Sequence, residues 1–355
     1  MLFDSPEITA ILSKYANEPD FAVPEVVFLA RSPDLMGERL LIEQVMLSLP
    51  ASVRKVWKSR FINTNHSPHK STWFQIMLAD WLAQTGSTNP EPTILGNNPD
   101  FLVTAGDLNI VVEAKAILKT DDMRHQEIWK NEVQWLLNDI SAPSYAVYIK
   151  RLKLQSRIDV TKFLDTVIYW LQTNSKSCFH FEDNRGNHVA LETIWEREHG
   201  GVATIGPSGS FWLNPQKFHR PLRKKAGQHK AIRGSEYPYV IALYLEDKIY
   251  SAEEIAEAWF GRLSAIVDIN TGTVVDQRID RSGIHFYGSK IRHRSVTGTL
   301  VFHDVFDDRK KSRMLQAWYI QNPYANKPID PWIFPVSARF VVQNQNNRNY
   351  EMEWK

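Results

Sequence analysis

Two carboxylates and a lysine form the group of residues in this sequence that is best suited to catalysis or metal binding. Glu113 follows the pair Pro99-Asp100 by thirteen residues, and Lys115 stands two positions after Glu113. Gly106 followed by an aspartate favours a two-residue hairpin loop, which would place Asp100 directly opposite Glu113. Side chains alternate along a strand, so Lys115 would share a face with Glu113. Paired carboxylates suit Mg²⁺, and a neighbouring lysine can stabilise the charge on a phosphate under attack.

These residues resemble the motif of the PD-(D/E)xK nuclease superfamily, whose fold is called restriction-endonuclease-like. The resemblance covers roughly residues 71–150 and implies a core of a helix, three strands, a helix and a strand. It also implies that Asp100 and Glu113 are ligands of Mg²⁺ or Mn²⁺ and that Lys115 is the catalytic lysine. The implied function is a metal-dependent nuclease that hydrolyses DNA, in restriction, phage defence, mobile-element processing or repair.

The helix before these strands departs from the pattern of that superfamily. Gln75 stands where the fold usually has a glutamate, and an amide brings no charge to a metal. Three outcomes follow: the site uses one metal, another acid takes the role, or catalysis is impaired. The candidate acids are Asp80, Glu43 and Glu38.

Other interpretations of the same residues stay open. Glu113 and Lys115 could form a solvated ion pair on an edge strand, and Gln75 could be a buried amide bonded to backbone. The chain could also be a non-catalytic nucleic-acid-binding or assembly subunit with a degenerate site, or an RNA nuclease. A homodimer or a multi-subunit system is a further expectation, because cutting both strands of a duplex requires two sites.

A basic segment at 217–233 contains no acid and is a candidate for contact with phosphates, the main electrostatic target on nucleic acid. A solvated helix is the alternative. Smaller basic clusters follow at 290–294 and 309–313. The candidate nucleic-acid-binding residues of the first segment are Lys217, Arg220, Arg223, Lys224, Lys225, Lys230 and Arg233.

Apolar periodicity and turn residues predict the helices and strands that carry these side chains. Residues 1–65 are mainly helical, 66–70 form a polar turn, and 176–216 are irregular. His66 and His69 lack a third ligand nearby and are expected in that turn. Helices are predicted at 71–85, 123–138, 160–171, 221–232 and 252–260, and strands at 93–95, 101–104, 109–114, 145–150, 239–245 and 298–303.

The predicted fold class is α/β, with a restriction-endonuclease-like mixed central sheet flanked by helices. A helical N-terminal extension would span 1–65, a nuclease core 66–261, and a C-terminal α+β region 262–355. A chain of 355 residues exceeds the size of one hydrophobic core, which favours such a division.

The composition is that of a globular protein, with 43% hydrophobic and 23% charged residues. The net charge of +2 hides an asymmetry, since residues 1–150 carry 13 Lys/Arg against 18 Asp/Glu and the rest is basic. A lone cysteine, Cys178, the absence of a basic N-terminal signal and the lack of a long apolar run favour a cytoplasmic protein without a membrane partner.

Overall fold

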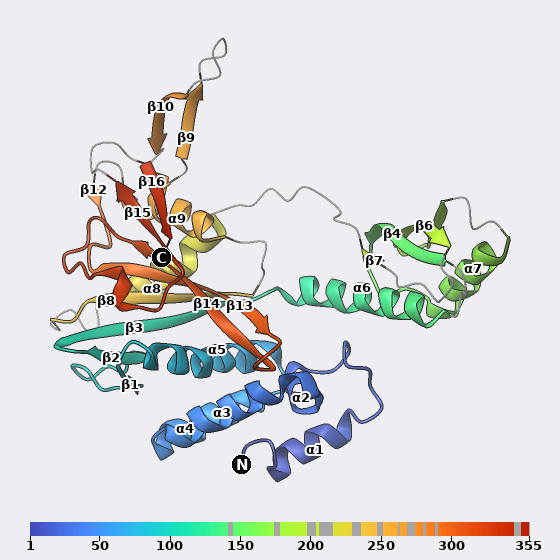
Figure 1. Cartoon of the computed structure of the whole chain (residues 1–355), viewed down its shortest axis with the longest axis horizontal. Helices are drawn as coiled ribbons and strands as arrows, with labels where there is room; N and C mark the ends of the chain where they lie inside the picture. The colour runs from blue at the N-terminus through green and yellow to red at the C-terminus, as the bar shows by residue number, and fades with distance from the viewer. Residues whose placement is uncertain are drawn as a thin grey trace. The chain divides into compact units, whose positions relative to one another are not determined.

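Two compact units make up the chain (Figure 1). The computed structural model describes residues 1–140, 145–173, 178–196, 204–205, 216–228, 236–246, 251–261, 263–267, 274–279, 282–287, 290–343 and 349–354. The main unit comprises 1–17, 24–118 and 213–355, and the inserted unit comprises 18–23 and 119–212.

The first part of the main unit is a layer of helices, as the sequence predicts. Ser5 caps the first helix by accepting a hydrogen bond from the backbone N–H of Ile8. Pro50 precedes the fourth helix, where its fixed φ suits a helix start. The elements are α1 (Pro6–Lys14), α2 (Glu25–Arg31), the 3₁₀ helix η1 (Pro33–Leu35), α3 (Met36–Ser48), α4 (Ala51–Phe61) and α5 (His66–Ala83).

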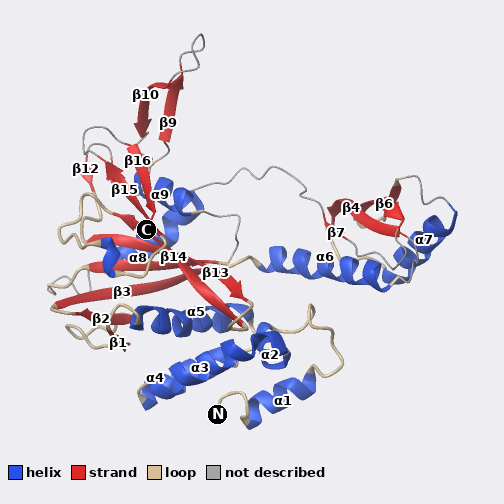
Figure 2. Cartoon of the chain, in the orientation of Figure 1, coloured by secondary structure: helices blue, strands red, loops and turns tan. Residues whose placement is uncertain are grey.

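A mixed sheet of eight strands forms the centre of the main unit (Figure 2). Its order is β1-β2-β3-β8-β13-β14-β15-β16, so β3 and β8 lie inside it. The strands are β1 (Ser87–Pro90), β2 (Phe101–Ala105), β3 (Leu108–Ile117), β8 (Tyr239–Leu245), β13 (Val296–Asp307), β14 (Ser312–Gln321), β15 (Ala338–Gln343) and β16 (Asn349–Trp354).

Both faces of β8 are apolar, so helices must cover the sheet on both sides. This strand pairs in parallel with β3 and with β13, and all seven of its residues are buried. Ile241 and Leu243 pack with α8 (Gln216–Gln228) and α9 (Ala252–Phe260), while Tyr244 meets α5 through the ring of Phe74. Figure 1 shows α5 along one face of the sheet and α8 and α9 on the other.

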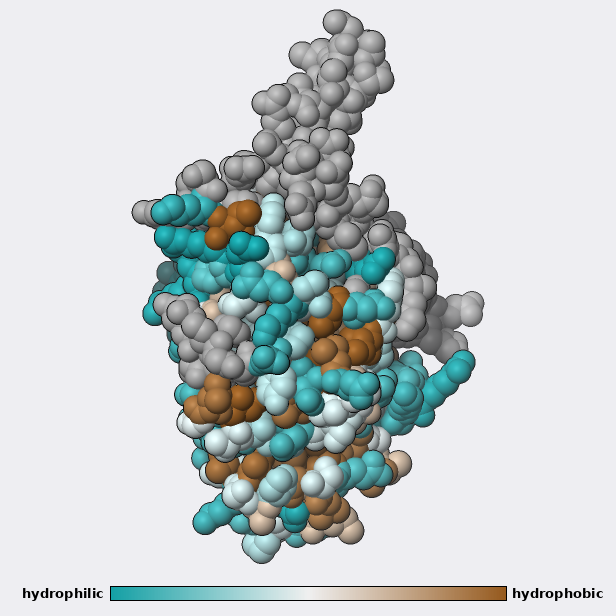
Figure 3. Space-filling view, turned by 90° about the vertical axis from the view of Figure 1, so that its left-hand side faces the viewer, coloured by the Kyte–Doolittle hydropathy of each residue, from teal (hydrophilic) through white to brown (hydrophobic). Residues whose placement is uncertain are grey.

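Smaller hairpins complete the main unit. They are β9 (Leu263–Val267) with β10 (Val274–Ile279) and β11 (Phe286–Tyr287) with β12 (Lys290–Ile291), and the 3₁₀ helix η3 spans Pro331–Ile333. The visible face of the molecule is mainly hydrophilic with scattered apolar patches (Figure 3). None of the described helices is long and apolar enough to cross a membrane.

The inserted unit has its own four-stranded sheet, in the order β5-β6-β4-β7. Phe163 and Trp170 of α7 pack on Phe179 of β5, and this forms a second core. The elements are α6 (Asp121–Asp139), β4 (Tyr145–Lys153), α7 (Val160–Thr173), β5 (Phe179–Glu182), β6 (His188–Glu196) and β7 (Thr204–Ile205).

Several sequence-based boundaries are wrong. The helix expected from Ser71 begins at His66, so 66–70 is not a turn, and the basic helix begins at Gln216 rather than Pro221. No strand spans 93–95, where Ile94 makes an isolated bridge to Asn97, and 176–216 contains strands. Apolar periodicity marks the buried face of an element and carries less information about the residue at which the element begins or ends.

The predicted extent of the core and the domain boundaries at 65 and 261 also differ from the structure. The helix and strand after β3 in sequence, α6 and β4, belong to the inserted unit. The helix and strand that follow β3 in the main unit are α8 and β8, about a hundred residues later. The C-terminal strands β13 to β16 join the central sheet rather than a separate region. Local patterns show that a strand exists but not which sheet it joins.

Candidate functional site

The hairpin of β2 and β3 places Asp100 opposite Glu113, as the sequence predicts. Phe101 pairs with Val112 and Ala105 with Leu108, which leaves Gly106 and Asp107 as a two-residue loop. Gly106 has φ +59°, the left-handed conformation that glycine tolerates best. Asp100, the residue immediately before β2, therefore lies across from Glu113.

Glu113 and Lys115 share the face of β3 that carries Val111, the face turned toward α8. Their partners on β8 are Ile241 and Leu243, so β3 is not an edge strand. Glu113 is buried, with 8% of its surface exposed, whereas Lys115 is exposed. Glu113 is therefore not half of a solvated pair with Lys115.

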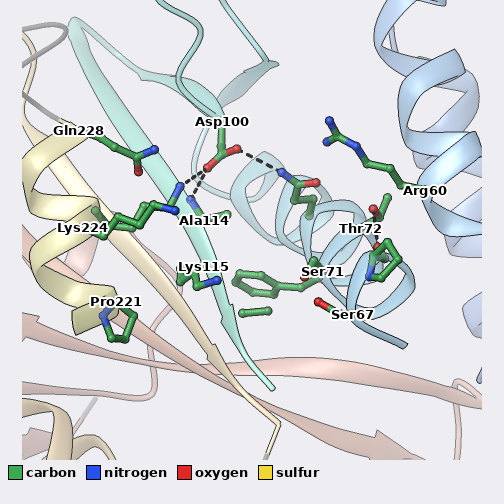
Figure 4. Close-up of a pocket in the computed structure, with 15 residues that line it drawn as sticks. Arg60, Ser67, Ser71, Thr72, Asp100, Ala114, Lys115, Pro221, Lys224 and Gln228 are labelled. Carbon is green, nitrogen blue, oxygen red and sulfur yellow. Dashed lines mark hydrogen bonds and ion pairs between the residues drawn. The ribbon is translucent and has the colours of Figure 1, made fainter. Parts of the chain in front are cut away.

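Asp100 accepts hydrogen bonds from three donors, of which two come from α5 and β3 and the third is Lys225. The backbone N–H of Ala114 donates to Oδ2 at 2.8 Å, and Nε2 of Gln75 donates to Oδ1 at 3.1 Å (Figure 4). Gln75 of α5 is thus bonded to a carboxylate rather than to backbone. None of the alternative acids Asp80, Glu43 and Glu38 is among the described residues that line the site.

Lys225 is the residue that joins the two carboxylates. Its Nζ lies 2.7 Å from Oε2 of Glu113 and 3.1 Å from Oδ2 of Asp100. Its backbone oxygen accepts a hydrogen bond of 2.7 Å from the hydroxyl of Tyr239, which ties α8 to β8. The sequence places Lys225 in a phosphate-binding segment, whereas the structure places it between the candidate metal ligands.

The sequence contained one signal for this position. Phe218 and Leu222 are buried on the sheet-facing side of α8, and Lys225 continues their spacing of i, i+4, i+7. A lysine within an apolar stripe requires a buried partner of opposite charge.

Burial and charge shift the pKa values of this cluster. Burial and the neighbouring Asp100 raise the pKa of Glu113 to about 7, against the opposing effect of Lys225. Burial lowers the pKa of Lys225, but the two carboxylates outweigh it and the net shift is upward. Burial, followed by the charges of Lys225 and Lys224, lowers the pKa of Lys115.

A pocket of about 500 Å³ opens beside Asp100. Figure 4 shows Arg60 on one side of it and Lys115 and Lys224 on the other, with Ser67 and Ser71 projecting from α5. The lining residues are Arg60, Ser67, Pro68, Ser71, Thr72, Phe74, Gln75, Asp100, Ala114, Lys115, Ala116, Pro221, Lys224, Lys225 and Gln228. Asp100 is the single acid among them.

Two other described members of the basic segment do not reach this pocket. Arg220 and Arg223 are exposed on α8 and do not line it. The side chain of Lys217, together with Lys230 and Arg233, lies outside the described residues. In the part of α8 that the structure describes, Lys224 and Lys225 are the members that reach the pocket.

The carboxylate pair fits a divalent cation. Oδ2 of Asp100 and Oε2 of Glu113 already converge on one positive charge, the ammonium of Lys225. Hard carboxylate oxygens are the ligands that Mg²⁺ and Mn²⁺ prefer. A metal at this position would have to displace the ammonium of Lys225. Gln75 contributes no negative charge, so the two carboxylates would bind the metal more weakly than three acids would.

A second group of possible metal ligands lies elsewhere in the main unit. Glu25, His66 and Glu246 each offer a ligand atom, and these atoms lie within 4.8 Å of one another, so the cluster could hold a metal ion. Nε2 of His66 is 2.7 Å from Oε1 of Glu246. The prediction that His66 and His69 belong to a surface turn is wrong, because His69 is 1% exposed and bonds to the backbone oxygen of Phe61.

Two cations neutralise Glu25 in this second cluster. Nζ of Lys70 and Nη1 of Arg313 lie 2.8 Å and 2.5 Å from its Oε1. Burial raises the pKa of Glu25, but Lys70 and Arg313 outweigh it and hold the pKa well below its usual value. Arg313 also pairs with Glu38, so this member of the predicted 309–313 basic cluster is internal rather than available to a ligand.

No protein-family model, curated protein or solved structure matches this chain. Any function must therefore be argued from the residues of the two clusters and the pocket.

Proposed function

We propose that this protein is a metal-dependent nuclease that hydrolyses phosphodiester bonds of DNA. One observation carries the proposal: carboxylate oxygens of Asp100 and Glu113 converge on one cation at the edge of a pocket lined by further cations. A carboxylate pair selects a metal, and the basic lining selects a polyanion. The two lie next to each other, as hydrolysis of a phosphodiester requires.

The order of elements supports the same proposal. In the main unit, the described elements α5, β1, β2, β3, α8 and β8 follow one another, with the inserted unit between β3 and α8. This is the succession of a helix, three strands, a helix and a strand expected from the resemblance to PD-(D/E)xK nucleases.

The roles of individual residues follow from their contacts. Asp100 and Glu113 would hold the metal, which when bound polarises a phosphate and lowers the pKa of an attacking water. Gln75 and the N–H of Ala114 orient Asp100. Lys115 faces the pocket, where its ammonium can neutralise charge on the phosphate. In the reaction a water oxygen bonds to phosphorus, one ester P–O bond breaks, and the leaving oxygen takes up a proton.

Cleavage assays test the proposal. Purified protein is incubated with supercoiled plasmid, single-stranded circular DNA and RNA, in Mg²⁺, Mn²⁺ or chelator. We expect DNA cleavage that needs a divalent metal and falls at least about 100-fold in Asp100→Asn, Glu113→Gln and Lys115→Ala. Asp107→Asn is the matched control, because Asp107 is an exposed acid on the same hairpin. Cleavage by Lys115→Ala at the rate of the unaltered protein would reject the assignment, and cleavage of RNA alone would change the substrate.

The contacts of Lys225 and Gln75 favour one alternative, a nucleic-acid-binding subunit without catalysis. Lys225 already neutralises both carboxylates, and Gln75 supplies an amide where a third acid would strengthen metal binding. Such a protein would bind DNA equally well in Mg²⁺ and in chelator and would never cut it. Binding isotherms in both buffers, measured beside the cleavage assay, separate the two functions.

A further inference from the structure

The pocket beside Asp100 has two cationic sides rather than one. Lys115 and Lys224 stand on the side of β3 and α8, and Arg60 of α4 stands across from them (Figure 4). Ser67 and Ser71 of α5 lie on the same side as Arg60. The N-terminal helical layer therefore contributes directly to the pocket.

Arg60 is available to a ligand. Its side chain is exposed, and among the described residues it forms no ion pair. The hydroxyl of Thr72, by contrast, donates to the backbone oxygen of Pro68 and is already used. Ser67 and Ser71 thus add hydroxyl donors to the wall of the pocket that carries this free guanidinium, and both kinds of donor suit phosphate oxygens.

The two sides would contact two different phosphates. The scissile phosphate must lie at Asp100, near Lys115, if the proposed function holds. Arg60, on the opposite side, then faces a neighbouring phosphate of the same strand. We infer that Arg60, with Ser67 and Ser71, binds this second phosphate and that the substrate enters the pocket as a single strand of nucleic acid. The inference rests on the proposed function and names its substrate class.

The size of the pocket favours a single strand over a duplex. About 500 Å³ suits a ligand the size of a nucleotide. A B-form duplex has a major groove about 12 Å wide, and its backbone is held in a fixed helix. A single strand can bend its backbone between the helices α4 and α5 on one side and α8 on the other. The substrates would be single-stranded DNA, unpaired ends and flaps, or single-stranded RNA.

Binding without catalysis tests this inference. Fluorescence anisotropy of a labelled 12-nucleotide DNA strand, its RNA equivalent and a blunt duplex is measured in chelator, so that nothing is cut. We expect a single strand to bind more tightly than the duplex. Arg60→Gln should weaken single-strand binding about tenfold, because it removes the binding free energy of one charge-assisted hydrogen bond. It should also reduce the slope of log K against log salt by about 0.7, the value for one phosphate on a single strand.

Two further variants make the outcome specific. Arg60→Lys keeps the charge and should retain the salt slope while losing part of the affinity. Lys55→Gln removes an exposed cation of the same helix outside the pocket and should bind as the unaltered protein does. Equal loss in Lys55→Gln and Arg60→Gln, no loss in either, or tighter binding of the duplex would overturn the inference. Arg60-dependent single-strand binding by a protein that cuts nothing would reject the nuclease proposal while leaving the binding subsite standing.

Discussion

The ammonium of Lys225 lies 2.7 Å from a carboxylate oxygen of Glu113, although the two residues are 112 positions apart in the chain. The inserted unit occupies most of the sequence between them. Glu113 is buried on an interior strand, and its charge is tolerable there because α8 brings a cation to it. The candidate site therefore depends on α8 as much as on the β2–β3 hairpin.

Replacing Lys225 by methionine should destabilise the fold and make it responsive to metal. The substitution leaves Asp100 and Glu113 close together without a cation, at a cost of about 3 kcal/mol. Urea unfolding at pH 8 measures this loss, because Glu113 has a pKa of about 7 in the unaltered protein and is ionised there at pH 8. Mg²⁺ at a hundred times its Kd should restore about 2.7 kcal/mol. Lys224→Met, on the exposed side of the pocket, is the control, and equal responses to Mg²⁺ would contradict a shared position for metal and ammonium.

Replacing Gln75 by glutamate should lower the stability of the metal-free protein and raise its affinity for a divalent metal. A carboxylate there cannot donate to Asp100 and adds a like charge, so the free energy of unfolding without metal should fall by about 1 kcal/mol. With metal, a third acid should tighten Mn²⁺ binding about tenfold by isothermal titration calorimetry. Gln75→Ala removes the donor without adding charge and should not gain affinity. Unchanged Mn²⁺ binding in Gln75→Glu would place the metal elsewhere.

Part of this site follows from local pattern and part does not. The register of Asp100 and Glu113 was predictable because a two-residue loop determines every pairing of the hairpin. Tyr239–Leu245 was predictable as a strand because seven consecutive apolar residues fit an interior parallel strand. In both cases the information lies within a few neighbouring residues.

The partners of these elements could not be predicted in the same way. α6 and α8 both follow β3 and both are helices, and nothing within either one shows which packs on the central sheet. Arg60 stands 40 residues before Asp100 and reaches the pocket through the packing of α4 on α5. Arg313 lies in a basic run that resembles a surface patch, yet its burial depends on carboxylates of α2 and α3. Such contacts are set by topology rather than by local sequence.

Arg313 should be one of the most sensitive positions for stability. Its side chain is only 15% exposed, and the charges of Glu25 and Glu38 outweigh the effect of burial and raise its pKa well above the usual value. Arg313→Met leaves the buried Glu38 and the mostly buried Glu25 with less compensation and should cost about 3–5 kcal/mol of unfolding free energy. Chemical denaturation compares it with Arg309→Met, an exposed cation of the turn before β14. Similar small losses in both variants would show that the buried network contributes little.

His285 should make the main unit sensitive to acid. It stacks on the rings of Trp259 and Phe260, and its Nδ1 is 2.9 Å from the backbone oxygen of Arg292. Burial, followed by the charge of His293, lowers the pKa of His285 to about 3. A histidine in the unfolded chain has a pKa near 6.5. As the pH falls below about 6.5, the unfolded state therefore binds a proton at this residue while the folded state does not. Stability should then fall by up to about 1.4 kcal/mol per pH unit from this residue, down to about pH 3. His285→Gln should be less stable at pH 7.5 but lose less between pH 6 and pH 4 in urea titrations. An unaltered pH slope in that variant would show that His285 is not the residue that resists protonation.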